Sequence, residues 1–195
     1  MIRGLFTLVL LLVLGGAGLA YLMSQQQPEA ASGLRPVRTS VKDAVTFDEK
    51  IASVEVAIAT AKRTSTAQRV SLLFTDAELT SRAALAADQL TGGIVATDPQ
   101  IHVRAGSVVL TAGVSFQGFP LNLAVVAIPV AVDGRTSIGI QEIQTGGLPL
   151  PDLIKKELDA QIAKILDPAT LGIPLDVTRI EAREGSLLVE LVANP

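Results

Sequence analysis

The sequence contains no cysteine and only one histidine among its 195 residues. Without cysteine there are no disulfide bonds, no thiol chemistry, no cysteine-ligated zinc and no lipid-modified cysteine at the N-terminus. Because His102 is the only histidine, a metal site built from several histidines is excluded too. We therefore predict no metal site and no cofactor.

Catalytic and nucleotide-binding motifs are also missing. No G-x-S-x-G, S-x-x-K, P-loop or G-x-G-x-x-G pattern occurs, and no nucleophile motif lies beside His102, which we interpret as a half-exposed strand residue. The acidic pairs Asp48/Glu49 and Asp76/Glu78 sit where helix starts favour negative charge. We predict that the protein is not an enzyme and has no catalytic residue, although carboxylates brought together from distant segments leave no signature in one sequence.

Charge is scarce and nearly balanced. Charged residues make up 18% of the chain, the formal net charge is −3, and 49% of the residues are hydrophobic. This balance gives no reason to expect a nucleic-acid partner. The length fits one domain with an appendage.

A run without charged residues, 4–23, lies at the N-terminus. Twenty helical residues span about 30 Å, the thickness of a bilayer core. Arg3 and the α-amino group favour a cytoplasmic N-terminus and an extracytoplasmic C-terminal domain. We predict a single-pass transmembrane anchor in the cell membrane over residues 1–23. The alternative is a signal peptide cleaved after the small-x-small sequence Gly18-Leu19-Ala20.

The segment after the anchor has little apolar periodicity. Residues 24–46 include Gln25-Gln26-Gln27-Pro28, and their composition predicts a flexible tether. From residue 47 onward, apolar residues recur at helical spacing and predict an amphipathic helix. The members of this stripe are Phe47, Ile51, Val54, Ile58 and Ala61. We therefore place a single α+β domain at residues 47–195.

Beyond that helix, a short strand is predicted at residues 70–74. Thr75 and Glu78 then form a capping box that begins a second helix, which reaches about residue 90. From residue 101 the periodicity changes to two, and short turns at residues 105–106, 117–120 and 133–134 separate apolar strands. Turns this short join antiparallel strands, so the pattern predicts a β-meander.

Irregularities in these strands are expected to curve the sheet. Pro129 cannot donate a ladder hydrogen bond and is therefore expected at an edge or a bulge. Gly139 and a phase slip at residues 141–143 indicate a second irregularity.

Both faces of the strand at residues 121–132 are apolar, whereas an antiparallel sheet usually has one solvated face. Helices, a bound apolar ligand or a partner must cover the second face. Residues of the same phase on neighbouring strands share a face, which gives a candidate lipid-binding surface. The predicted lining is Val114, Phe116, Leu123, Val125, Ile138 and Ile140, with Leu158 and Ile162 from a helix that follows the meander.

That helix is predicted at residues 151–166. Pro151 suits its first turn, Leu158 and Ile162 lie on its apolar stripe, and Asp167-Pro168 stops it. Strands at residues 173–183 and 186–192 then form a hairpin. The predicted fold class is α+β, with a long curved antiparallel β-meander wrapped on amphipathic helices and an N-terminal transmembrane helix.

The order of these elements, with the segments FTDAELTS, GGLPLP and IPLDVTRIEAREGSLLVELV, resembles bacterial membrane-anchored proteins of the LmeA and YpmS kind. These proteins are similar to the tubular lipid-binding (TULIP, BPI-like) superfamily. The resemblance covers residues 47–195 and implies a highly curved sheet around a long helix, with an apolar groove that holds acyl chains outside the cytoplasmic membrane. It brings no catalytic residues. Because the chain is much shorter than the eukaryotic transfer proteins, the resemblance favours lipid binding over lipid transfer.

Two hypotheses for function follow. In the first, the protein is a membrane-anchored extracytoplasmic module that binds a phospholipid or similar amphiphile in the apolar groove. In the second, the helices simply cover the sheet, and the protein is a non-enzymatic adaptor or scaffold for a protein partner in cell-envelope assembly. An open apolar tunnel favours the first hypothesis, and an exposed apolar patch of several hundred Å² on a packed core favours the second.

Overall fold

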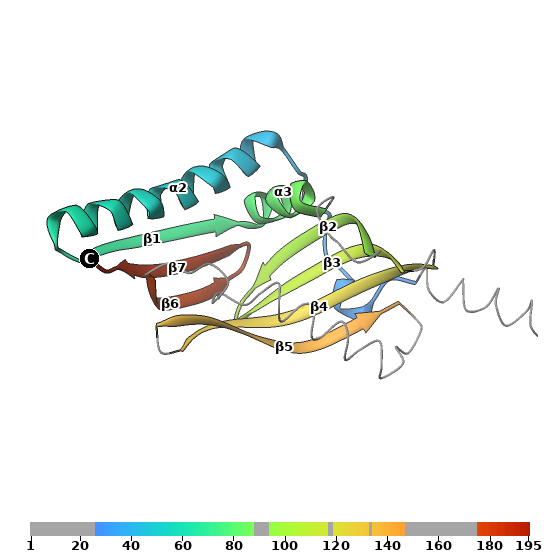
Figure 1. Cartoon of the computed structure of the whole chain (residues 1–195). Coiled ribbons are helices and arrows are strands. Elements are labelled where there is room, and N and C mark those ends of the chain that lie inside the picture. The colour runs from blue at the N-terminus through green and yellow to red at the C-terminus, as the bar shows by residue number, and fades with distance from the viewer. Residues whose placement is uncertain (1–25, 88–93, 117–118, 133, 147–174) are drawn as a thin grey trace, which may run out of the picture.

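A computed structural model describes residues 26–87, 94–116, 119–132, 134–146 and 175–195 (Figure 1). It confirms the α+β class with antiparallel sheets. Within these ranges, no helix combines the length and the apolar character that a bilayer crossing requires. The predicted anchor at residues 4–23 and the predicted helix at residues 151–166 lie outside them. In chain order the elements are η1 (Glu29–Ala31), α2 (Val41–Thr64), β1 (Gln68–Thr75), α3 (Asp76–Ala87), β2 (Ile94–Arg104), β3 (Ser107–Phe116), β4 (Phe119–Val132), β5 (Arg135–Thr145), β6 (Leu175–Arg183) and β7 (Ser186–Ala193).

The strands form two antiparallel sheets. The four-stranded sheet has the order β2-β3-β4-β5 and is the predicted meander, whereas the three-stranded sheet has the order β1-β7-β6. The predicted C-terminal hairpin is therefore present as β6 and β7. Strand β7 of this hairpin pairs with β1 over the whole length of β1, from Gln68 to Thr75. The last strand of the chain therefore lies beside the first one.

Helix α2 covers one face of the three-stranded sheet (Figure 1). The Phe47 and Phe74 rings lie 4.9 Å apart between their centroids, at the centre of this contact. Ile51, which the predicted stripe includes, is 41% exposed and points away from the core. The buried cluster comprises Val54, Leu72, Phe74 and Leu191.

The predicted tether at residues 24–46 is wrong where the structure describes it. Helix α2 begins at Val41 rather than Phe47, because the Ser40 hydroxyl caps the helix by accepting a hydrogen bond from the Asp43 amide. Before it, Pro28 and Ala31 are buried, and η1 packs against β3 and β4. The polar composition of this segment comes from solvent-facing side chains around a few buried contacts.

The capping box predicted at the start of α3 is confirmed. The Thr75 amide donates to Glu78 Oε2 at 2.8 Å, and the Glu78 amide donates to Thr75 Oγ1 at 3.3 Å. The short strand before it is also present, as β1. Local sequence chemistry therefore fixes the junction between β1 and α3.

Helix α3 lies along the edge of the four-stranded sheet. Thr80 is fully buried, and its hydroxyl accepts a hydrogen bond from the Ile101 amide at 2.9 Å and donates one to the Ile101 carbonyl at 3.1 Å. Asp76 Oδ1 accepts a hydrogen bond from the Val103 amide at 2.9 Å. These side chains take the place of a further strand, so the edge of β2 is protected from pairing with another chain.

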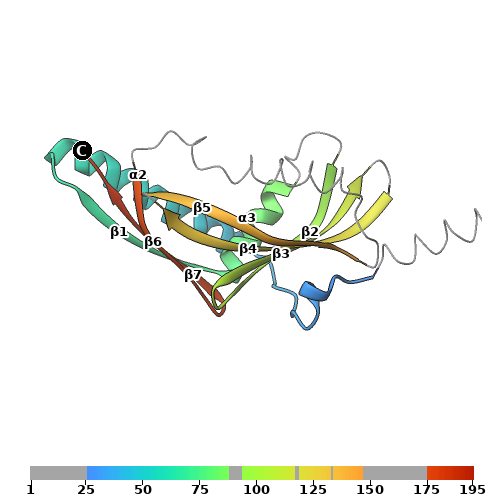
Figure 2. The same cartoon turned by 90° about the horizontal axis from the view of Figure 1, so that it is seen from below.

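Strand β6 lies across one end of the four-stranded sheet (Figure 2). At this end, the Gly106 amide in the β2–β3 turn donates to the Ala182 carbonyl at 3.0 Å. The Val177 amide donates to the Gly134 carbonyl in the β4–β5 turn at 2.7 Å. The three-stranded sheet therefore closes the end of the four-stranded sheet at which these two turns lie.

The predicted irregularities are confirmed. Val126 pairs with Glu142 and Ala127 pairs with Ile140, which leaves an extra residue in β5 at the predicted phase slip. Pro129 lies in a part of β4 that extends beyond its pairing with β3, so its missing amide hydrogen removes no bond to that strand. Two further bulges, in β2 between Thr97 and Gln100 and in β6 between Val177 and Arg179, are features that the sequence analysis missed.

Candidate functional site

The strand register places the apolar residues of the meander on one face. Leu110 pairs with Val125, which pairs in turn with Ile143, and residues directly opposite one another share a face. We define the apolar face as the face of the sheet that carries the odd-numbered residues 121–129 of β4 and the residues of β3 and β5 that pair with them. Residues of the same phase further along these strands also belong to it. The predicted lining residues Val114, Phe116, Leu123, Val125, Ile138 and Ile140 all have this phase.

These residues differ in exposure. Val125, at the centre of the face, is only 3% exposed. Val114, Leu123, Ile138 and Ile140 are half-buried. The Phe116 side chain and the predicted helical contributors Leu158 and Ile162 lie outside the part of the chain whose side chains are described.

The opposite face of the four-stranded sheet is more polar than the strand at residues 121–132 alone indicates. We call it the polar face. Apolar residues also lie here beside polar ones, among them the buried Ala124 and Val109. The polar residues at its centre are Gln100, His102, Thr111, Asn122 and Gln144.

An N-terminal segment, residues 26–37, crosses the polar face, and we call it the strap. It includes the blue η1, which lies on one side of the four-stranded sheet in Figure 2. Side chains from three strands bind its backbone. Gln144 Oε1 accepts from the Ala30 amide at 2.7 Å, Gln100 Oε1 accepts from the Val37 amide at 2.7 Å, and Asn122 Nδ2 donates to the Gln26 carbonyl at 3.4 Å.

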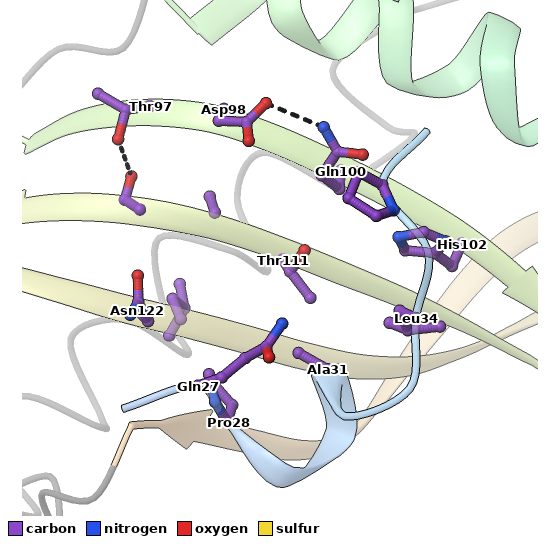
Figure 3. Close-up of a pocket in the computed structure, with 14 residues that line it drawn as sticks. Gln27, Pro28, Ala31, Leu34, Thr97, Asp98, Gln100, His102, Thr111 and Asn122 are labelled. Carbon is purple, nitrogen blue, oxygen red and sulfur yellow. Dashed lines mark hydrogen bonds between the residues drawn. The ribbon is translucent and has the colours of Figure 1, made fainter. Parts of the chain in front are cut away.

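A pocket of about 500 Å³ lies between the strap and the polar face (Figure 3). Gln27, Pro28, Ala31 and Leu34 line it from the strap, and Thr97, Asp98, Gln100, His102, Thr111 and Asn122 line it from the strands. Asp98 has a φ of 47° in the β2 bulge, and its carboxylate accepts a hydrogen bond from Gln100 Nε2 at 2.9 Å. Gln100 therefore connects the bulge to the strap.

His102 is 7% exposed, so its interpretation as a half-exposed residue is wrong. The strap covers the polar face on which it lies. Burial lowers the pKa of His102, because it disfavours the charged imidazole, and the positive charge of Arg104 acts in the same direction. The nearby Asp76 carboxylate opposes this shift. The environment of His102 therefore favours the neutral imidazole.

Burial raises the pKa of the Asp76 carboxyl, and the Val103 amide that it binds limits the shift. Asp76 binds the edge of β2 through the Val103 amide. Within the described residues, no three His, Asp or Glu side chains converge on a point where a metal ion could bind. The chemistry that the described residues offer is therefore apolar contact on one face and backbone recognition by amides on the other.

Comparison with known proteins adds no family. No protein-family model matches the chain, and no curated protein matches its sequence. The functional argument consequently rests on the geometry of the two faces.

The strap is the main site feature that the sequence analysis missed. The available signal is a pair of prolines, Pro28 and Pro36, which fix φ in an extended backbone. An extended segment of this kind can pack along a sheet or remain a free tether, so the prolines do not distinguish the two. The acceptors that hold it, Gln100 and Gln144, lie far away in the sequence.

Proposed function

We propose that the protein is a membrane-anchored extracytoplasmic module that binds one phospholipid or similar amphiphile along the apolar face, without catalysing a reaction. The observation that carries this proposal is the register, which aligns apolar side chains of three adjacent strands in one phase. A ligand site for an acyl chain needs such a continuous apolar lining with few polar groups.

The size of the apolar face suits an acyl chain. Residues 121–129 of β4 extend over about 27 Å at a rise of roughly 3.4 Å per residue. The acyl chains of one leaflet fill about 15 Å, half of a bilayer core of roughly 30 Å. One chain therefore fits along the strand with length to spare.

The described helices are occupied elsewhere, which supports a ligand on this face. Helix α2 packs against β1 and β7, and α3 packs along β2, whereas the main contacts of β4 among the described elements are with β3, β5, β6 and η1. Of these, η1 belongs to the strap on the polar face. Half-buried apolar residues such as Leu123 and Ile138 are thus placed where a removable apolar group can cover them.

Organic extraction followed by mass spectrometry tests the proposal. Residues 28–195, which lack the predicted anchor, are purified without detergent, and the extract is quantified against protein. We expect a phospholipid or related amphiphile at close to one molecule per chain, and binding of a fluorescent phospholipid after delipidation. A folded domain that carries no lipid and does not bind the probe would refute the proposal and favour the adaptor function.

A further inference from the structure

The strap delivers the end of the predicted anchor to one particular end of the four-stranded sheet. Gln26, where the described chain begins, is bound through its carbonyl by Asn122 Nδ2. Asn122 lies near the start of β4, and its own carbonyl accepts a hydrogen bond from the Gly146 amide just after β5. This is the end at which β3 stops at Phe116 and β4 starts at Phe119.

The chain between the anchor and this point is very short. The uncharged run ends at Met23, and three residues reach at most about 11 Å at 3.3–3.6 Å each. A headgroup layer is roughly 5–7 Å thick on each side of the bilayer core. A membrane anchor that ends at residue 23 therefore leaves Gln26 only just outside the headgroups.

The strap is attached to the sheet at several points, so a membrane anchor that precedes it would restrain this end of the sheet. Its backbone is held by Gln144 of β5, Asn122 of β4 and Gln100 of β2. Pro28 and Ala31 are buried between these bonds. A displacement of the sheet from the membrane would have to break these contacts together.

The opposite end of the same sheet is closed by β6, which contacts both the Gly106 and the Gly134 turns. The two ends of the apolar face are therefore not equivalent. One is covered by the three-stranded sheet, and the other carries the start of the strap, which follows the predicted anchor.

We propose that the end of the four-stranded sheet at Phe116 and Phe119 docks on the bilayer surface, with the strap as the device that holds it there. This inference rests on the anchor and the ligand class of the proposed function. In this orientation an amphiphile moves from the bilayer directly onto the apolar face, so its acyl chain does not cross water. The partner of this surface is thus a lipid surface rather than a protein.

Energy transfer from single-cysteine probes tests the orientation, because the natural chain has no cysteine. Ser115 pairs with Pro120 and Ser137 pairs with Val130, so the two serines share the polar face at opposite ends of β4. Ten residue steps separate these two partners in β4, which corresponds to about 34 Å. Full-length Ser115→Cys and Ser137→Cys variants carry a donor dye in phosphatidylcholine vesicles that contain a headgroup-labelled acceptor lipid.

We expect energy transfer to the bilayer to be several-fold more efficient from position 115 than from position 137. Both labelled proteins must melt like the unlabelled chain. Equal transfer, or stronger transfer from position 137, overturns the proposed orientation. Loss of the protein from the vesicles through cleavage of the anchor overturns it as well, but neither result affects the lipid extraction described above.

A lengthened tether separates the role of the strap from intrinsic membrane affinity of the sheet. Twenty Gly and Ser residues inserted between Ser24 and Gln25 give a flexible linker of roughly 25 Å. If the short connection holds the sheet end at the bilayer, the difference between the two probes should disappear. A difference that survives the insertion overturns the role assigned to the strap.

Discussion

Lys50 of α2 and Glu78 of α3 form an ion pair with 2.6 Å between Lys50 Nζ and Glu78 Oε1, although Glu78 is only 6% exposed. Burial by itself raises the pKa of Glu78, but hydrogen bonds from Lys50 and from the Thr75 amide outweigh it, and the net pKa is lowered. Lys50 Nζ also lies 5.6 Å from the centroid of the Phe74 ring. The pair therefore joins α2, β1 and α3 at one point.

Removing the cation should destabilise the domain more than removing an exposed one at the same helix interface. Lys50→Met leaves the buried Glu78 carboxylate without its charged donor and should cost about 1–3 kcal/mol. Arg82→Met is the matched control, because Arg82 pairs with Asp48 at the surface and its loss should cost less than about 1 kcal/mol. Urea unfolding at neutral pH measures both, and equal losses would contradict the burial of the Glu78 pair.

His102 should make the domain less stable as the pH falls below neutrality. Its pKa is lowered in the folded state, so the unfolded chain, with a pKa of about 6.5, takes up the proton first. Stability is therefore fully present above the unfolded pKa and is lost as the pH falls from there toward the folded pKa. His102→Gln lacks this titration, so its melting temperature should fall less than that of the wild type between about pH 7.5 and pH 5.5.

The wild type and His102→Gln both contain Asp76 and Glu78. The contribution of these carboxyl groups to the pH dependence of the melting temperature therefore largely cancels when the two proteins are compared. Parallel melting curves across this range would show that the strap does not hold His102 in a desolvated site. A larger fall for the variant would contradict the direction of the pKa shift.

Local sequence patterns predict the features that depend on a few neighbouring residues. The Thr75/Glu78 capping box and the slip near Gln141 follow from side-chain chemistry and strand phase, which the sequence displays directly. Strand phase also groups Val125 with Ile138, because their shared face depends only on alternation within a meander.

Long-range contacts escape this kind of reasoning. The alternation in β7 identifies Val189 and Leu191 as core-facing, but nothing in it selects β1 as the neighbouring strand. The burial of His102 likewise depends on a strap that the sheet recruits through distant glutamines such as Gln144. Such contacts are set by the packed fold rather than by any local propensity.

Gly134 should tolerate alanine poorly. It has a φ of 76°, and a Cβ at this position would lie 2.9 Å from Asp176 Oδ1. Asp176 is held in place by Asn194, whose Nδ2 donates to Oδ2 at 2.7 Å. Gly134→Ala should therefore cost about 1–2 kcal/mol for the left-handed backbone and roughly 1 kcal/mol more for the displaced carboxylate.

Gly106→Ala is the matched control for this change. Gly106 has a similar φ of 80° and also contacts β6, but among the described residues no atom beyond its chain neighbours lies within 4 Å of the position that a Cβ would take. It should show the backbone cost alone, and the two denaturation midpoints give the difference. Equal destabilisation by the two substitutions would mean that β6 does not pack closely against the β4–β5 turn.

A charge on the apolar face should abolish ligand binding while a charge next to it on the polar face should not. Ile138 and Ser137 are neighbours in β5, and their side chains lie on opposite faces of the sheet. An unpaired carboxylate in an apolar site costs several kcal/mol, so Ile138→Asp should weaken binding of a fluorescent phospholipid on the order of a hundredfold. Ser137→Asp introduces the same charge at an exposed position and should bind like the wild type.

The choice of Ile138 matters because Val125 is 3% exposed, and Val125→Asp is expected to unfold the domain whether or not a ligand binds there. Ile138 is half-buried, and the ladder bonds of its strand do not depend on its side chain. Thermal melting of both variants establishes that they are folded before binding is compared. If folded Ile138→Asp and Ser137→Asp bind the probe equally well, the lipid does not lie on the apolar face, and the polar face with its strap becomes the site to investigate.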